Sequence, residues 1–321
     1  MVKILDCTIR DGGHLNNWHF SDEVVFATYN AAQKSGIDYF EIGYRNFFSS
    51  KNKGKYYRCT DEVLHFIKSD ISCKLCVMAD IGKADIDSFC VYDLNNTPVV
   101  TVRIAVYPDK LNEAFDFCSK LFDKGYDVFL NLMAISRFEE THYQILNNWN
   151  RKNILKALYF ADSFGSLYPS DIPVIADKLQ NLGYKNLGFH SHNNLQLAFA
   201  NTIKAIECGV DIVDATVYGM GRSAGNLPIE LLTAYLNKNG IKKFSQEAYL
   251  TLIEKYYIDL FNEYHWGYNV PSFASGLFDI HPNYTKSLAT EDFEQLFDYA
   301  QKVHQKCPVH FDKQSLEKIL N

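Results

Sequence analysis

The chain has 321 residues, of which 47% are hydrophobic and 15% aromatic, enough for a large buried core. Its formal charge is −6 and it contains no long run of lysine and arginine, so neither a nucleic-acid surface nor an anionic-membrane surface is expected. No segment reaches the ~20 consecutive apolar residues of a membrane-spanning helix. The eight cysteines follow no short repeating spacing, and a strand pattern begins at residue 2, which predicts a cytoplasmic protein with reduced thiols and no signal peptide.

Short apolar runs alternate with amphipathic stretches along the first 240 residues. The runs predict eight strands, at residues 2–8, 39–44, 74–80, 99–107, 127–135, 157–163, 186–192 and 212–219. The stretches between them show helical spacing, most weakly after the third strand, and several end at glycine, the usual helix stop. Eight near-continuous apolar strands separated by helices predict an α/β protein with a closed (β/α)8 TIM barrel. An open doubly wound sheet is the alternative, but no GxGxxG motif follows the first strand.

The pattern changes after about residue 240. Residues 245–265 and 291–305 predict helices, and the aromatic-rich segment 266–284 between them predicts a loop. We therefore expect a barrel domain over residues 1–240 and a helical C-terminal extension over residues 241–321, packed on the barrel. The extension could cover the barrel mouth or form a contact in a homodimer.

Polar residues gather where the predicted strands end, which is the face of a TIM barrel that carries the chemistry. In chain order they are TIRDGGH at 8–14, Glu41, Asp80, Asp162, His190 with His192, and the loop GMGRSAGN ending at Asn226.

The sequence GFHSHNN at the seventh strand predicts a metal site. Residues i and i+2 of a strand point the same way, so His190 and His192 should both face the barrel interior. With Asp11 they provide two imidazoles and a carboxylate, a set that suits a divalent cation and leaves positions open for a substrate. We expect Mn²⁺ first, with Mg²⁺, Zn²⁺ or Co²⁺ as alternatives. Two histidines that merely bond nearby carboxylates or a helix start are the structural alternative.

Arg10 and His14 flank Asp11 and are candidate catalytic residues. A cation beside a metal stabilises an enolate or oxyanion, and an imidazole is suited to act as a general base near neutral pH. A surface ion pair for Arg10 and a loop hydrogen bond for His14 are the alternatives. The loop GMGRSAGN could cradle a phosphate, although glycine and serine also form ordinary loops.

Taken together, TIRDGGH, ADSFG, GFHSHNN and GMGRSAGN resemble the motifs of the DRE-TIM metallolyase superfamily, in the right order over residues 4–230. This superfamily includes 3-hydroxy-3-methylglutaryl-CoA (HMG-CoA) lyase, the isopropylmalate and homocitrate synthases, and 4-hydroxy-2-oxovalerate aldolase. The resemblance implies that Asp11, His190 and His192 hold a divalent metal. It implies that Asn226 is a further ligand or supports the ligands, and that Arg10 stabilises an enolate.

Two local differences make the chain most similar to the 4-hydroxy-2-oxovalerate aldolase branch. Gly13-His14 stands where the synthases typically have Glu-Gln, and the loop 219–226 lacks the cysteine of the acyl-CoA lyase. The resemblance implies that His14 is the base and that Tyr268 corresponds to a tyrosine in the aldolase's C-terminal region, with packing as the alternative for Tyr268. The rest of segment 266–284 does not match closely, so the aldolase's substrate and partner dehydrogenase are not carried over.

We therefore predict a divalent-metal-dependent aldolase, a carbon–carbon lyase that cleaves or forms a 4-hydroxy-2-oxo acid through a metal-bound pyruvate-type enolate. Its partners would be a small 2-oxo acid and an aldehyde. The main alternative is a Claisen-type acyltransferase that condenses acetyl-CoA with a 2-oxo acid on the same metal site. A Schiff-base aldolase is disfavoured because Lys83 is the only lysine near the C-terminal end of a strand. An amidohydrolase-type enzyme would carry its HxH on the first strand.

Overall fold

The computed structural model of the chain describes residues 2–48, 51–67, 72–288, 292–306 and 309–312. Eight parallel strands close into a barrel in the order β1 to β8, with β1 paired to both β2 and β8. The strands are β1 Lys3–Asp6, β2 Tyr39–Tyr44, β3 Lys74–Asp80, β4 Thr101–Val106, β5 Asp127–Leu132, β6 Leu155–Asp162, β7 Leu187–Ser191 and β8 Ile212–Ala215. The predicted TIM barrel is therefore confirmed.

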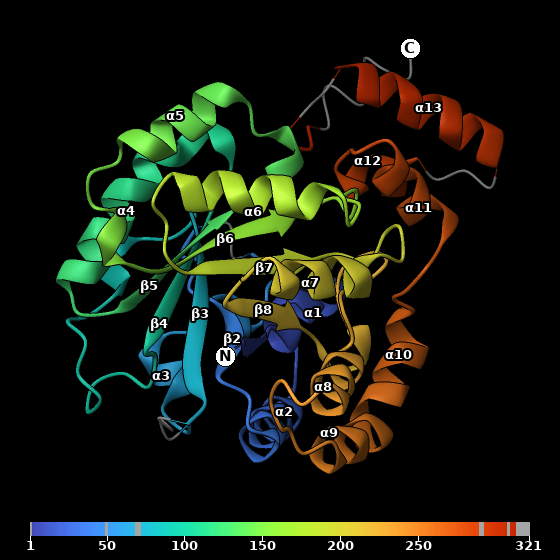
Figure 1. Cartoon of the computed structure of the whole chain (residues 1–321). Coiled ribbons are helices and arrows are strands. Elements are labelled where there is room, and N and C mark those ends of the chain that lie inside the picture. Colours follow the sequence, from blue (N-terminus) through green and yellow to red (C-terminus); the bar gives the residue numbers. More distant parts are fainter. Residues whose placement is uncertain (1, 49–50, 68–71, 289–291, 307–308, 313–321) are drawn as a thin grey trace.

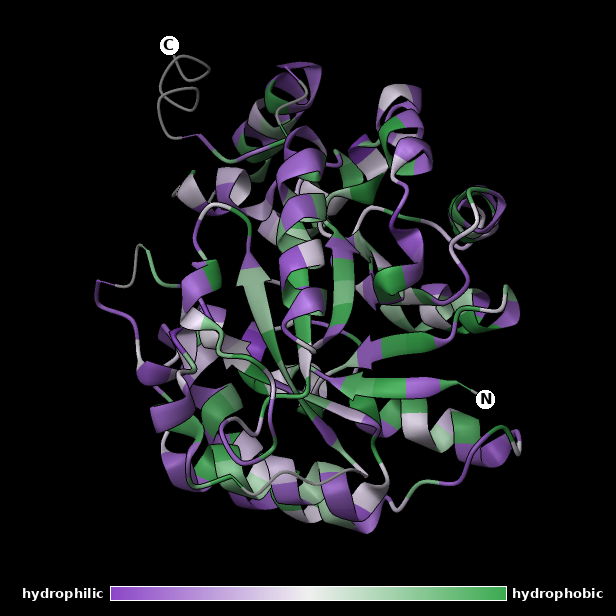
Figure 2. Cartoon of the chain, turned by 90° about the vertical axis from the view of Figure 1, so that its left-hand side faces the viewer, coloured by the Kyte–Doolittle hydropathy of each residue, from purple (hydrophilic) through white to green (hydrophobic). Residues whose placement is uncertain are grey.

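Helices surround the barrel (Figure 1). In the first 240 residues they are α1 Thr8–Asn16, α2 Asp22–Ser35, α3 Asp61–Leu64, α4 Leu111–Asp123, α5 Glu140–Asn148, α6 Asp171–Asn181, α7 Ala198–Glu207 and α8 Ile229–Lys238. Figure 2 shows mostly hydrophobic strands inside helices of mixed polarity, as expected for strands covered on both faces. Within the described residues, no helix combines the length and apolar character that a membrane crossing needs.

The first strand is shorter than predicted, because α1 already begins at Thr8. The Asp6 carboxylate accepts a hydrogen bond from the backbone N–H of Thr8 (2.9 Å), a local turn that ends β1. The indole of Trp18 donates to the carbonyl oxygen of Arg10 (3.0 Å), and a Cβ on Gly13 would overlap that indole. Tertiary packing thus makes a helix of a Gly-Gly segment whose intrinsic helix propensity is low.

Two predictions about secondary structure are wrong. The stretch after β3 forms only a short 3-10 turn, Ile86–Ser88, in place of a helix. The segment 266–284, predicted as a loop, contains α11 Val270–Leu277 and the first turn of α12 Pro282–Ser287. Asn269 and His281 cap these two helices, and each helix has proline in its first turn, which were helix-start signals in the sequence.

The C-terminal region is helical over most of its described length. Its elements are α9 Glu247–Leu252, a π-helical turn Ile253–Tyr257, α10 Ile258–Tyr264, α11, α12 and α13 Phe293–Lys306. α9 packs against α2, and α11 to α13 share a small apolar core of their own. In Figure 1, α11 and α12 (orange-red) lie on the side to which the arrowheads of β6 and β7 point. The division into domains at residues 240 and 241 stays a prediction.

Candidate active site

A cavity of about 400 Å³ opens at the C-terminal ends of the strands. Its wall includes five residues predicted from the sequence: Arg10, Asp11, His14, His190 and His192. They come from opposite ends of the barrel sequence and meet because β1 and β7 are separated only by β8 in the closed sheet. A larger groove of about 510 Å³ lies on the outside between α2 and α9, and none of the predicted residues lines it.

Asp11, His190 and His192 lie close enough to share one metal ion. Their ligand atoms are all within 4.8 Å of one another, and all three side chains are buried. Nε2 of His192 lies 3.7 Å from Oδ2 of Asp11. Bonds of about 2.1 Å to a common cation would place neighbouring ligand atoms roughly 3 Å apart, so small side-chain movements suffice for coordination.

Each histidine is held through its Nδ1. Nδ1 of His190 donates to the carboxylate of Asp214 (2.8 Å), and its buried Nε2 has no hydrogen-bond partner among the described residues. Nδ1 of His192 donates to the backbone carbonyl of Asp162 (3.0 Å). Burial lowers the pKa of His192 to about 3, so its Nε2 carries a lone pair at neutral pH. A ring held from behind with its second nitrogen turned towards the cavity is the arrangement that a divalent cation requires, so these residues fit a metal.

The carboxylate in this set is ionised. Burial alone would raise the pKa of Asp11, but the charge of the adjacent Arg10 holds that pKa well below its usual range. Nη1 of Arg10 lies 2.8 Å from Oδ1 of Asp11.

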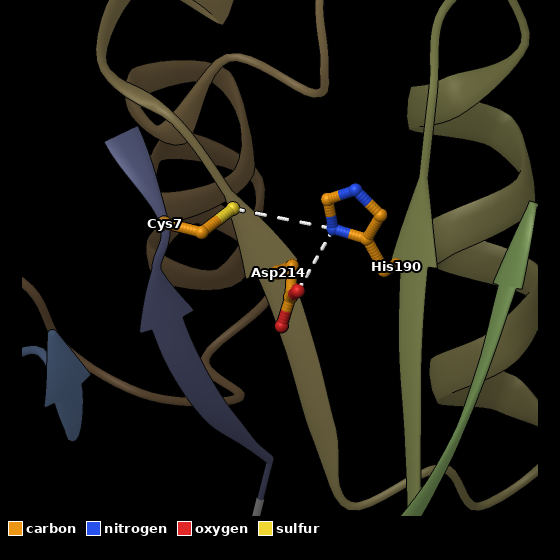
Figure 3. Close-up of side chains that lie close together, drawn as sticks. All are labelled: Cys7, His190 and Asp214. Carbon is orange, nitrogen blue, oxygen red and sulfur yellow. Dashed lines mark hydrogen bonds and ion pairs between the residues drawn. The ribbon is translucent and has the colours of Figure 1, made fainter. Parts of the chain in front are cut away.

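Behind His190 lies a second group of side chains that metal ions favour, shown in Figure 3: Cys7, His190 and Asp214. Sγ of Cys7 lies 4.0 Å from Nδ1 of His190 and donates to the carbonyl of Ala215 (3.6 Å). Burial raises the pKa of the Cys7 thiol well above its usual value. Since Oδ2 of Asp214 is also paired with Nη1 of Arg103 (2.6 Å), we assign this group to the orientation of His190.

A row of buried charges connects Arg10 with His190 through the barrel interior. Nε of Arg10 donates to Oε2 of Glu41 (2.7 Å), and Nε of Arg103 lies 3.4 Å from Oε1 of the same carboxylate. Arg103 then reaches Asp214 on β8. Because an unpaired buried charge is costly, the row fixes both ends of the site. Arg103 and Asp214 were missed from the sequence, although a charged residue inside an apolar strand was the available signal.

Arg10 and His14 face the cavity beside Asp11. The buried Nη2 of Arg10 has no hydrogen-bond partner within the described residues and can donate to an oxyanion. Nε2 of His14 lies 3.3 Å from the hydroxyl of Tyr44 and 3.9 Å from Oδ1 of Asp11. Burial lowers the pKa of His14 well below its usual value; Asp11 opposes this shift, and the charge of Arg222 adds to it. His14 is therefore an unprotonated base at neutral pH.

Asn226 also lies beside the predicted ligands. Its Nδ2 donates to Oδ2 of Asp11 and to the carbonyl of Met220 (3.1 Å), while its buried Oδ1 has no partner. A backbone bridge to His192 holds the loop in place, and a Cβ on Gly221 would overlap the amide of Asn226. Asn226 thus fixes Asp11, and its Oδ1 is the atom available to a cation.

Tyr268 is not part of the cavity wall. Its side chain is 60% exposed and packs near Phe273, with ring centroids 6.4 Å apart. The structure does not bring it to the other predicted residues, and its catalytic role stays a prediction. The C-terminal region instead contributes His281, Asn283 and Lys286 to the wall. His281 and Asn283 were missed because their segment was predicted as a loop, Lys286 follows that segment, and no motif marks any of the three.

Comparisons with known proteins identify relatives of this chain. The sequence profile of the HMGL-like family matches residues 124–255. The 4-hydroxy-2-oxovalerate aldolase of Burkholderia pseudomallei is 30% identical over 245 residues, which cover 75% of this chain and 70% of the aldolase. The oxaloacetate decarboxylase of Mycobacterium tuberculosis is 28% identical over 239 residues, which cover 74% of this chain and 70% of the decarboxylase.

Solved structures extend the similarity to nearly the whole chain. The N-terminal domain of a provisionally assigned aldolase from Bacteroides vulgatus superposes with a TM-score of 0.81 at 31% identity, covering 92% of this chain and 99% of that domain. The HMG-CoA lyase of Pseudomonas aeruginosa superposes with a TM-score of 0.61, covering 81% of this chain and 93% of the lyase. At 16% identity, this second match supports the fold alone.

The barrel, the site and the relatives define a metal-dependent carbon–carbon lyase of the aldolase type. The chain belongs to the HMGL-like family, within the DRE-TIM superfamily that its motifs predicted. Enzymes of this family depend on a divalent metal, and Asp11, His190 and His192 are candidate ligands for it.

Proposed function

We propose that this enzyme is an aldolase that cleaves, and in reverse forms, a 4-hydroxy-2-oxo acid by way of the enolate of pyruvate or a homologue. The observation that carries the proposal is that His14, Arg10 and the three candidate ligands line one cavity. A base for a hydroxyl proton, a donor for an enolate oxygen and a cation site are the groups that such a cleavage needs.

The residues divide the reaction between them. Asp11, His190 and His192 would hold the divalent cation, which when bound supplies Lewis acidity towards the 2-oxo group. His14 takes the proton of the C4 hydroxyl while the C3–C4 bond breaks, and the C4 fragment leaves as an aldehyde. The electron pair of the broken bond enters the enolate, whose oxygen accepts from the free Nη2 of Arg10. C3 then takes up one proton, so the protons balance and pyruvate or a homologue is released.

A second candidate function is decarboxylation of a 2-oxo diacid, favoured by the similarity to an oxaloacetate decarboxylase. That reaction gives the same enolate and also needs the cation site and Arg10, but it releases CO₂ and has no hydroxyl proton to remove. His14 therefore separates the two reactions, because only the aldol cleavage needs it as a base.

The first test measures pyruvate and aldehyde release from a panel of 4-hydroxy-2-oxo acids, after treatment with EDTA and again with Mn²⁺, Mg²⁺, Zn²⁺ or Co²⁺. We expect equal amounts of both products and only with metal, with Mn²⁺ as the proposed cofactor. Metal-dependent CO₂ release from oxaloacetate without cleavage of any hydroxy acid would establish the decarboxylase instead. Consumption of a 2-oxo acid that requires acetyl-CoA would establish the Claisen-type acyltransferase, and a borohydride-trapped adduct at Lys83 would establish a Schiff-base enzyme.

A further inference from the structure

Part of the cavity wall carries positive charge that no acidic side chain of the described residues balances. Within that part of the chain, four cationic side chains line the cavity: Arg10, Lys83, Arg222 and Lys286. Arg10 is paired with Asp11 and Glu41, and Lys83 with Asp80 (2.8 Å).

Arg222 and Lys286 have no acidic partner within the described residues. Two unpaired cations in one cavity are notable in a chain whose net charge is −6.

His281 adds a third donor at the same place, as its hydrogen bonds show. Its Nδ1 accepts from the backbone N–H of Asn283 (3.1 Å), which caps α12. Nδ1 therefore has no proton of its own, and the ring must carry its proton on Nε2. That Nε2 lies 3.5 Å from Nη1 of Arg222, so two N–H donors face each other.

Two donors that lie 3.5 Å apart can share one acceptor to the side of the pair. An anionic oxygen in that position would accept from both Arg222 and His281, and Lys286 on the next turn of α12 would add a second positive charge. We call Arg222, His281 and Lys286 the rim. The rim comes from the loop after β8 and from α12 with the residue that caps it. We call Arg10, Asp11, His190 and His192 the floor. Arg10 and Asp11 lie on α1, His190 lies on β7, and His192 directly follows β7.

We propose that the rim binds a second anionic group on the substrate, so that the preferred substrate is a dianionic 2-oxo acid. Resting on the proposed aldolase function, this inference places the carboxylate and keto group of the acid at the floor. The aldehyde half then carries a carboxylate or a phosphate, and that group contacts Arg222 and His281. A carboxylate and a phosphate each offer two anionic oxygens that one guanidinium can bind through parallel hydrogen bonds.

The experiment uses substrates that differ only in the distal group. 4-Hydroxy-2-oxoglutarate and 4-hydroxy-2-oxovalerate have the same carbon chain, with a distal carboxylate or a methyl group. 4,5-Dihydroxy-6-phosphooxy-2-oxohexanoate and 4,5,6-trihydroxy-2-oxohexanoate test the phosphate in the same way. We expect kcat/KM to be at least about tenfold higher for the anionic member of one pair, since hydrogen bonds to a charged group contribute roughly 1.5–3 kcal/mol. Which pair shows the preference distinguishes a carboxylate from a phosphate.

Arg222→Met should lower the anionic-to-neutral ratio of kcat/KM about ten- to a hundredfold, and Arg222→Lys should retain part of it. The matched control is Arg151→Met, which removes an arginine paired with Asp123 outside the cavity and should leave the ratio unchanged. Equal efficiency for both members of both pairs, or a ratio that Arg222→Met does not lower, would overturn the inference.

A binding measurement separates failure of this inference from failure of the proposed function. 2-Oxoglutarate and 2-oxopentanoate also differ only in a distal carboxylate, and neither has a C4 hydroxyl to cleave. If no probe is turned over, tighter calorimetric binding of 2-oxoglutarate to the Mn²⁺-loaded protein, lost in Arg222→Met, would keep the rim as an anion site and reject the aldolase. Equal binding of the two acids would reject the rim.

Discussion

The floor and the rim of the cavity are built in opposite ways. The floor side chains are buried, Arg10 and Asp11 pair with each other, and Glu41 and Asp214 hold Arg10 and His190 from behind. The rim side chains include two cations that have no acidic partner in the described part of the chain, and Lys286 is exposed. A floor whose groups are already positioned suits a reaction step, because no reorganisation is needed when charge develops. A rim with unsatisfied donors suits recognition, because its free energy is gained only when a ligand arrives.

Removal of a floor ligand should have the largest effect. In His192→Ala, we expect Mn²⁺ affinity to fall by more than the roughly hundredfold that loss of a supporting residue costs, and cleavage to fall with it. Calorimetric titration of the apoprotein with Mn²⁺ measures the first and pyruvate release the second. His65→Ala, at an exposed histidine, is the control. Normal metal affinity in His192→Ala would remove His192 from the ligand set.

His14→Gln should lower kcat about 10²- to 10⁴-fold with little change in Mn²⁺ affinity. Since burial puts the pKa of His14 well below its usual value, the wild-type enzyme should keep its base unprotonated as the pH falls. The acid limb of the kcat profile should therefore lie well below pH 6.5, and the variant should lose it. An acid limb at pH 6.5 or above in the wild type would contradict the environment assigned to His14.

Arg10→Met should lower kcat about 10²- to 10³-fold, the usual cost of losing one oxyanion donor, and change metal affinity far less. The variant also leaves Glu41 without one partner, so its thermal unfolding should be followed alongside. Arg10→Lys keeps a positive charge near Glu41 but lacks the guanidinium, so it distinguishes the loss of the oxyanion donor from a general destabilisation of the fold. Full activity in either variant would show that the assigned role of Arg10 is wrong.

Asp214→Asn tests whether the buried row of charges matters to the floor. Loss of the carboxylate behind Nδ1 of His190 should weaken Mn²⁺ binding about ten- to a hundredfold. Asp127→Asn, which changes a carboxylate at the start of β5 that pairs with Lys74 at the other end of the barrel, is the matched control. Equal Mn²⁺ affinity in both variants would mean that His190 needs no support from Asp214.

Lys286→Met should have the smallest effect. Its side chain is exposed, so we expect the anionic-to-neutral ratio of kcat/KM to fall only about two- to fivefold, as for surface ion pairs. Lys302→Met, at an exposed lysine of α13, should leave the ratio unchanged. A fall as large as that of Arg222→Met would show that the contribution of a rim residue to the preference for anionic substrates does not depend on its burial.

Most of the floor was predictable from local patterns. The period of apolar runs identified eight strands, and the rule that residues i and i+2 share a face put His190 and His192 together. The closed barrel then required Asp11, at the end of the first strand region, to lie near the seventh strand. The pattern could not show that Asp11 lies on a helix. That helix depends on the packing of Trp18 against Gly13, which is a tertiary contact.

The amino-acid sequence by itself predicted the barrel, the candidate metal ligands and the class of reaction, since each depends on short periodic patterns and on a closed topology that orders the strand ends. The tertiary structure alone decided that Arg103 and Asp214 hold His190, and that Arg222 and His281 share one end of the cavity. The reason is physical. A pairing between side chains 59 or 111 residues apart leaves no period in the sequence, and only the packed chain determines which charges find a partner.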